Sequence, residues 1–113
     1  MKTTIHVVIL LVLSALFAIA PARAADAGNA LITELGAANG VALACKHTAN
    51  MSAIKAVMIH AVPKTRAYGE VFEAATSESF LSQSSEPCPS ATDLSAKVDG
   101  IEARLKAHFK PQS

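Results

Sequence analysis

Soft metal ligands gather in one short stretch of the chain, which contains Cys45, His47, Met51, Met58 and His60. Thioether and imidazole groups suit copper, and His47 and Met51 have the spacing that puts two side chains on one face of a helix. Met58 and His60 would instead diverge by about 200° on a helix. Met51 and Met58 also fit the apolar face of a helix, where packing explains them. A metal (copper) or small-ligand carrier is therefore the alternative hypothesis, with His47, Met51, Met58 and His60 as its ligands.

A second group of polar residues surrounds Pro63. It is a short cationic patch with one aromatic ring and consists of His60, Lys64, Arg66 and Tyr68. A helix that begins near Pro63 would point free N–H groups toward an anion, so the patch is a candidate site for an anion or a partner. The more ordinary interpretation is a solvated junction between helices, in which Arg66 pairs with Glu70 or Glu73.

No set of residues predicts catalysis. A nucleophile, its base and a group that orients the base must come within hydrogen-bond reach of one another. The serines are concentrated between Ser77 and Ser90 or at expected helix caps, and the motif G-x-S-x-G does not occur in the sequence. We therefore expect that the chain is not an enzyme and needs no cofactor.

The chain has two cysteines, Cys45 and Cys88. They lack the C-x-x-C spacing that is typical of a redox-active or metal-binding pair. In an oxidising compartment two such cysteines form a structural disulfide. Closing a loop of about 44 residues stabilises a fold by roughly 4 kcal/mol in the chain-entropy model.

The first 24 residues predict a cleaved secretory signal peptide. Lys2 precedes an apolar stretch over 5–20, and Ala22-Arg23-Ala24 supplies the small residues that signal peptidase recognises. The alternative is a membrane anchor, but the apolar stretch is shorter than the roughly 20 residues that cross a bilayer. We expect cleavage after Ala24, a mature domain over 25–113, and a location in the bacterial periplasm or outside the cell.

Composition narrows the kinds of partner. The 113 residues carry a net charge of +1 and only 4% aromatic residues. Without residues 1–24 the chain keeps 8 Lys+Arg against 9 Asp+Glu, a net charge of −1. Neither net charge indicates the basic surface of a nucleic-acid-binding protein, and the few aromatic residues cannot provide the rings on which bases stack. We expect no nucleic acid and no membrane span after cleavage, and one domain at this length.

Apolar residues at helical spacing predict a first helix over 25–40. Gly36 and Gly40 are expected to weaken or end this helix, and Gly40 fits the left-handed position at a helix C-terminus. Residues 41–47 continue for one or two helical turns, because alanine favours helix there.

Two further helical stretches follow, over 51–61 and 64–83. Pro63 disfavours helical geometry in the residue before it. It therefore either separates two helices or kinks one, and both alternatives stay open. A loop is expected over 82–89, because two prolines flank Cys88.

The last helix begins after Ser90, a good N-cap residue, and ends before Pro111. It has one narrow apolar seam, formed by Leu94, Val98, Ile101, Leu105 and Phe109. This spacing fits burial against another helix, either in the same chain or in a second copy. The seam is therefore either part of the chain's own core or a surface that binds a partner.

These elements predict an all-α fold, a small single-domain bundle of three to four helices stapled by one disulfide. The layout is similar to that of small single-disulfide helical envelope proteins, which include acid-stress chaperones and immunity proteins. The similarity concerns architecture, and function does not follow from architecture. We expect a small binding or interaction protein of chaperone, immunity or inhibitor type. Its partner would be another protein or a second copy of itself.

Overall fold

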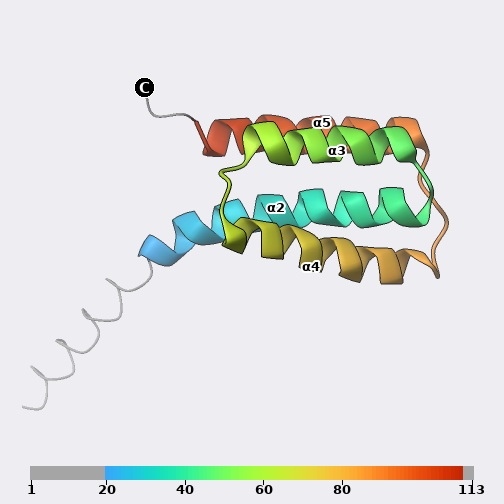
Figure 1. The fold of residues 1–113 in the computed structure, drawn as a ribbon, viewed down its shortest axis with the longest axis horizontal. Helices are drawn as coiled ribbons and strands as arrows, with labels where there is room; N and C mark the ends of the chain where they lie inside the picture. Colours follow the sequence, from blue (N-terminus) through green and yellow to red (C-terminus); the bar gives the residue numbers. More distant parts are fainter. Residues whose placement is uncertain (1–19, 111–113) are drawn as a thin grey trace, which may run out of the picture.

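The computed structural model describes residues 20–110, which form four α-helices. They are α2 (Ala20–Ala44), α3 (Thr48–Ala61), α4 (Arg66–Gln83) and α5 (Ala91–His108). Consecutive helices run in opposite directions, so the beginning of α2 and the end of α5 lie at the same end of the bundle (Figure 1). The predicted all-α bundle is confirmed. Most of the predicted signal peptide, residues 1–19, lies outside the described residues.

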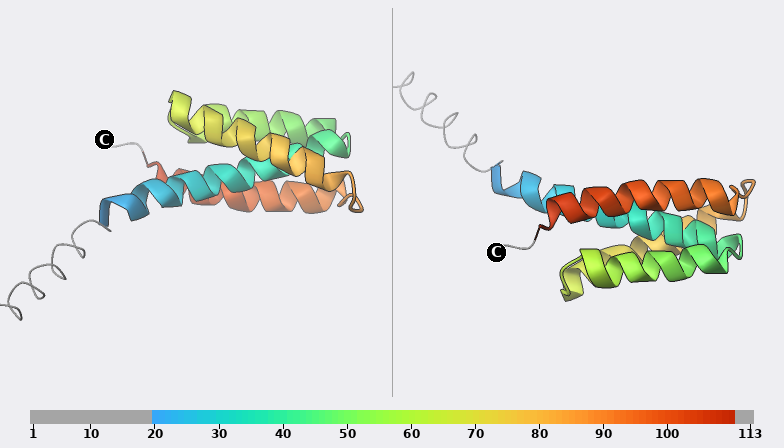
Figure 2. Two further views of the ribbon diagram at one scale, coloured as in Figure 1. Left: turned by 90° about the horizontal axis from the view of Figure 1, so that it is seen from below. Right: turned by 90° about the horizontal axis from the view of Figure 1, so that it is seen from above.

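The core is formed by α2, α3 and α5. α2 is the central helix, because α3, α4 and α5 all pack against it. The clustered buried residues are Ile32, Leu35, Ala38, Ala42, Ile54, Val57, Ala61, Val62, Leu94, Val98, Ile101 and Leu105. None of them belongs to α4, which lies along α2 and adds partly buried side chains at the edge of the core. Figure 2 shows α4 crossing α2 at a small angle, on the side away from α5.

The expectation that the first helix ends at Gly40 is wrong, because α2 continues through Gly36 and Gly40 to Ala44. Both glycines face the backbone of α4. A Cβ atom at Gly36 would lie 2.6 Å from the carbonyl oxygen of Phe72, and one at Gly40 would collide with the carbonyl oxygen of Thr76. The left-handed residue after the helix is Lys46, with φ 59°. The glycines thus allow two helices to approach closely, a role that outweighs the cost of glycine within a helix.

Polar contacts reinforce this close approach of α2 and α4. The Ser79 hydroxyl donates to the carbonyl oxygen of Ala37 at 2.6 Å. The Asn39 amide donates to the Thr76 hydroxyl at 3.3 Å. α4 therefore depends on close backbone packing and side-chain hydrogen bonds, with Ala75 as its buried apolar residue.

Pro63 separates two helices. α3 ends at Ala61, and Val62 has the extended backbone expected before a proline, with φ −119° and ψ 134°. α4 begins after Thr65, whose hydroxyl accepts a hydrogen bond from the Tyr68 N–H at 3.2 Å. The helix predicted over 64–83 is confirmed, with its first residue at Arg66.

The ends of the other helices lie close to the predicted residues. Ser90 caps α5, and its hydroxyl accepts from the Asp93 N–H at 3.0 Å. α5 ends at His108, before Pro111. The loop between α4 and α5 is slightly shorter than predicted, since α4 extends to Gln83. The buried amide of Gln83 donates to the carbonyl oxygens of Glu86 and Pro87, at 3.2 and 2.9 Å, and so holds the loop.

The predicted disulfide joins Cys45 to Cys88, with the two Cα atoms 5.8 Å apart. It links the turn after α2 to the loop before α5, two connections at the same end of the bundle. Disulfides persist in compartments that are not reducing, so the covalent structure points to such a compartment.

Candidate functional site

The four candidate metal ligands are spread along α3. His47 precedes the helix and His60 is in its last turn. The backbones of these two residues are therefore about 20 Å apart along the helix axis. Met51 and Met58 are half-buried and line the same groove, whereas His60 is exposed. The structure therefore brings the two methionines together and leaves the two histidines at opposite ends of the helix.

His47 takes part in a structural contact beside the disulfide. Its ring Nε2 lies 2.9 Å from the carbonyl oxygen of Pro89, and since a carbonyl only accepts, the Nε2–H is the donor. Nearby, the buried Asn50 amide donates to the carbonyl oxygen of Ala91 at 3.2 Å. These two bonds hold the beginning of α3 against the residues that lead into α5.

The cationic patch around Pro63 lies at the connection between α3 and α4. Lys64 and Arg66 are exposed, and Arg66 pairs with Glu70 at 4.0 Å across strongly exposed side chains. The Tyr68 ring packs edge-on against Phe109, with the ring centroids 5.4 Å apart. Thr65, which the sequence analysis did not identify, caps the helix. In the structure, Tyr68 thus packs against the end of α5, and the cations stay in solvent.

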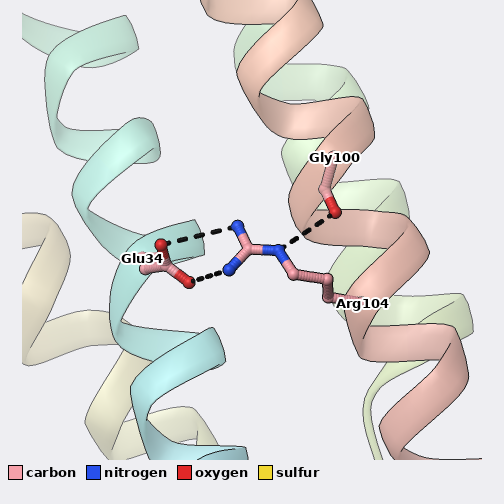
Figure 3. A network of polar contacts seen from close by, with 3 residues as sticks. All are labelled: Glu34, Gly100 and Arg104. Atoms are coloured by element: carbon pink, nitrogen blue, oxygen red, sulfur yellow. Dashed lines mark hydrogen bonds and ion pairs between the residues drawn. The ribbon is translucent and has the colours of Figure 1, made fainter.

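The apolar seam of α5 faces the chain's own core. Leu94, Val98, Ile101 and Leu105 are all buried, and Phe109 is half-buried at the end. α2 and α3 cover these residues within the chain, as the core interpretation of the seam requires. A half-exposed ion pair also joins α5 to α2. The Arg104 guanidinium donates to both carboxylate oxygens of Glu34, at 2.9 and 3.5 Å (Figure 3).

An apolar groove runs between α3 and α4. The two helices pack on α2 rather than on each other, which leaves a groove of about 460 Å³. Its lining includes Leu43 from α2, Met51, Lys55, Met58 and Ile59 from α3, and Phe72 from α4. Methionine side chains are flexible and polarisable, so they adapt to apolar surfaces of different shape.

Large apolar side chains are exposed beside this groove. They are Leu43 at 37%, Ile59 at 47%, Phe80 at 45% and Leu81 at 71% of their full accessible surface. A second hollow of about 440 Å³, lined by Leu43, Phe80 and Leu81 among others, shares Leu43 with the groove. We call this continuous surface the α3–α4 face: Leu43, Met51, Met58, Ile59, Phe72, Phe80 and Leu81.

One positive charge lines the groove, and one negative charge lies on the side of α4 that carries Phe80. Lys55 lines the groove from α3. On α4, Glu73 lies seven residues before Phe80, a spacing that puts both on one side of the helix. Neither Lys55 nor Glu73 is among the residues that form ion pairs within 20–110.

The α3–α4 face was not predicted from the sequence. Ile59, Phe80 and Leu81 lie outside the apolar stripes that predict helix burial, and this misfit is the signal that was available. Periodicity predicts which side of a helix is buried, but it does not tell whether a neighbouring helix covers its flank.

The chain was compared with protein-family models, with curated proteins and with solved structures, and no significant match was found in any of the three. None of the helices between Ala20 and His108 combines the length and the hydropathy that a membrane-spanning helix needs.

Proposed function

We propose that this chain is a small binding protein of the bacterial envelope, periplasmic or secreted, which uses the α3–α4 face to bind a protein partner and performs no catalysis. The sequence supports the location through the predicted signal peptide over 1–24. The Cys45–Cys88 disulfide supports it independently, because such bonds are rare in reducing compartments.

The observation that carries the proposal is the gathering of exposed apolar side chains on one face. Leu81, the most exposed of them, is accessible over 71% of its surface although the domain is small and its core is well formed. When a partner covers an exposed leucine and phenylalanine, the complex is stabilised by about 25 cal/mol per Å² of apolar area removed from water.

The shape of the face favours a protein over a small molecule. Leu81 and Phe80 project from α4 beside an open groove. A small ligand would cover little of the apolar surface of such projecting side chains. A second protein provides both a ridge for the groove and a pocket for the projecting residues, which is how helical surfaces recognise one another.

Site-specific photo-cross-linking in the envelope tests the proposal. A photo-reactive residue at Ile59 is expected to yield a defined cross-linked protein, identified by mass spectrometry. The same residue at Ala103, which is exposed on α5, is the matched control and is expected to yield no such product. Leu81→Glu, combined with the Ile59 probe, should abolish the product while the helix content stays unchanged.

Two results would contradict the proposal. Equal products from positions 59 and 103 would mean that the cross-links report random encounters. A product that survives Leu81→Glu would mean that the α3–α4 face does not recognise the partner. Mass spectrometry of the same envelope fraction tests the location separately, since cleavage after Ala24 leaves a chain that begins at Ala25.

A further inference from the structure

We propose that the occupant of the α3–α4 face is a second copy of this chain, so that two chains form a symmetric dimer. This inference rests on the proposed function, because it names the partner that the same face binds. A two-fold interface uses one patch twice, and the patch must therefore contain both the projections and the hollows that receive them. The α3–α4 face has both, with Ile59 and Leu81 as projections and the groove between the helices as a hollow.

The symmetry determines which residues meet. A two-fold axis that runs along the groove, parallel to the helices, places α3 of one copy over α4 of the other. Rotation about such an axis does not change a residue's height along the helices. Residues that are equally far from the α3–α4 connection, one on each helix, therefore face each other across the interface.

Lys55 of the groove and Glu73, on the side of α4 that carries Phe80, satisfy this condition. Lys55 lies six residues before Ala61, the last residue of α3, and Glu73 lies seven residues after Arg66, the first residue of α4. At 1.5 Å per residue, both are about 10 Å from the connection. Lys55 of one copy is thus level with Glu73 of the other, and the symmetry forms this attractive pair twice.

Gly69 is a second feature of α4 that fits the proposed dimer. It lies four residues before Glu73, on the same side of α4, and no heavy atom of the chain lies within 4 Å of the position that a Cβ would take there. Unlike Gly36 and Gly40, it therefore has no packing partner within the chain that requires a glycine. Gly69 therefore leaves open space on this side of α4, which the proposed dimer fills from outside the chain.

The residue that approaches Gly69 is Ile59 of the second copy. Ile59 lies two residues before the end of α3 and Gly69 three residues after the beginning of α4, so both are within about 5 Å of the connection along the axis. The 47% exposed side chain of Ile59 fits above the missing side chain of Gly69. At the far end of the groove, Phe80 is level with the beginning of α3, close to Met51 and Leu43 of the other copy.

Analytical ultracentrifugation of the oxidised protein over a wide range of concentration tests the proposal. The wild type is expected to sediment as a dimer that dissociates on dilution. Lys55→Glu and Glu73→Lys each place like charges together and are expected to raise the dimer Kd by at least about tenfold. The double variant exchanges the charges and is expected to restore the wild-type Kd. Circular dichroism checks that each variant is folded.

A pair of glycine variants separates an interface effect from an effect on the helix. Gly69→Ala is expected to raise the dimer Kd by at least about tenfold, because the new methyl group occupies the space of Ile59. Gly100→Ala is the matched control, since Gly100 is also helical with open space around its Cβ position but lies on α5. It should leave the Kd unchanged.

Several outcomes would overturn the dimer. A chain that is monomeric at every concentration would do so, as would a dimer whose Kd is unaffected by Gly69→Ala and by both charge reversals. If the photo-reactive residue at Ile59 cross-links only a different protein, the dimer is refuted while the proposed function stands. If it cross-links no protein, both fail.

Discussion

The contact between α2 and α4 makes a prediction that runs against ordinary helix propensity. Replacing a helical glycine by alanine normally stabilises a helix by about 1 kcal/mol. At Gly40 we expect the opposite, because the new Cβ would collide with the carbonyl oxygen of Thr76 and lie 2.7 Å from the backbone nitrogen of Phe80. At Gly100, where nothing lies within 4 Å, alanine is expected to give the ordinary gain.

The size of the effect follows from the atoms involved. Overpacking a well-fitted contact costs about 1–3 kcal/mol, and the upper value applies here because backbone atoms of a helix cannot rotate away. Subtracting the helix gain of about 1 kcal/mol leaves a net loss of about 2 kcal/mol for Gly40→Ala. For a domain of this size that loss corresponds to a Tm lower by about 8–16 °C.

Urea denaturation of the two oxidised variants, followed by circular dichroism at equal protein concentration, measures the difference. We expect Gly40→Ala to be less stable than Gly100→Ala by about 3 kcal/mol, with a similar m-value for both. The reasoning is refuted if Gly40→Ala is as stable as Gly100→Ala, since α4 would then not lie against α2 as closely as the structure has it.

Three further predictions concern the staple, a helix cap and the core. Replacing Cys45 and Cys88 by serine should lower the free energy of unfolding by about 4 kcal/mol, measured by urea titration against the oxidised wild type. A loss below about 1 kcal/mol would contradict the loop-closure argument. Ser90→Ala should cost about 1 kcal/mol in the same assay, because its hydroxyl accepts from the Asp93 N–H at 3.0 Å; no loss would mean that the cap is dispensable. Ile101→Ala should cost about 2–5 kcal/mol, because that side chain is fully buried. If it instead weakened association and left stability unchanged, the seam of α5 would face a partner after all.

Much of the bundle is predictable from local chemistry. The seam of α5 repeats at helical spacing, and burial of its members follows from that repeat. Ser90 caps because its hydroxyl and the N–H three residues on are neighbours in the chain. Pro63 interrupts the helix because its ring constrains the residue before it. Each effect depends on a few consecutive residues, so the sequence contains all the information that the prediction needs.

The glycines of α2 show where local chemistry is insufficient. In isolation, Gly36 and Gly40 destabilise a helix, and ending the helix at Gly40 is the reasonable prediction. In the fold they allow the backbone of α4 to approach, and the contacts so gained outweigh the helix cost. The meaning of a helical glycine depends on an element more than thirty residues away, which no short window contains.

The candidate site, too, is predictable from the sequence only in part. Side-chain type and spacing are enough to predict the possible ligand side chains, the two cysteines, the helices and their apolar stripes. The packing of the helices covers the seam of α5 and leaves Met51 and Met58 partly buried, packed against the core at the edge of a groove. It also decided that Ile59 and Leu81 remain exposed. The physical reason is that burial depends on which helices become neighbours: α4 docks on α2 through two glycines, and the flank of α3 therefore stays open.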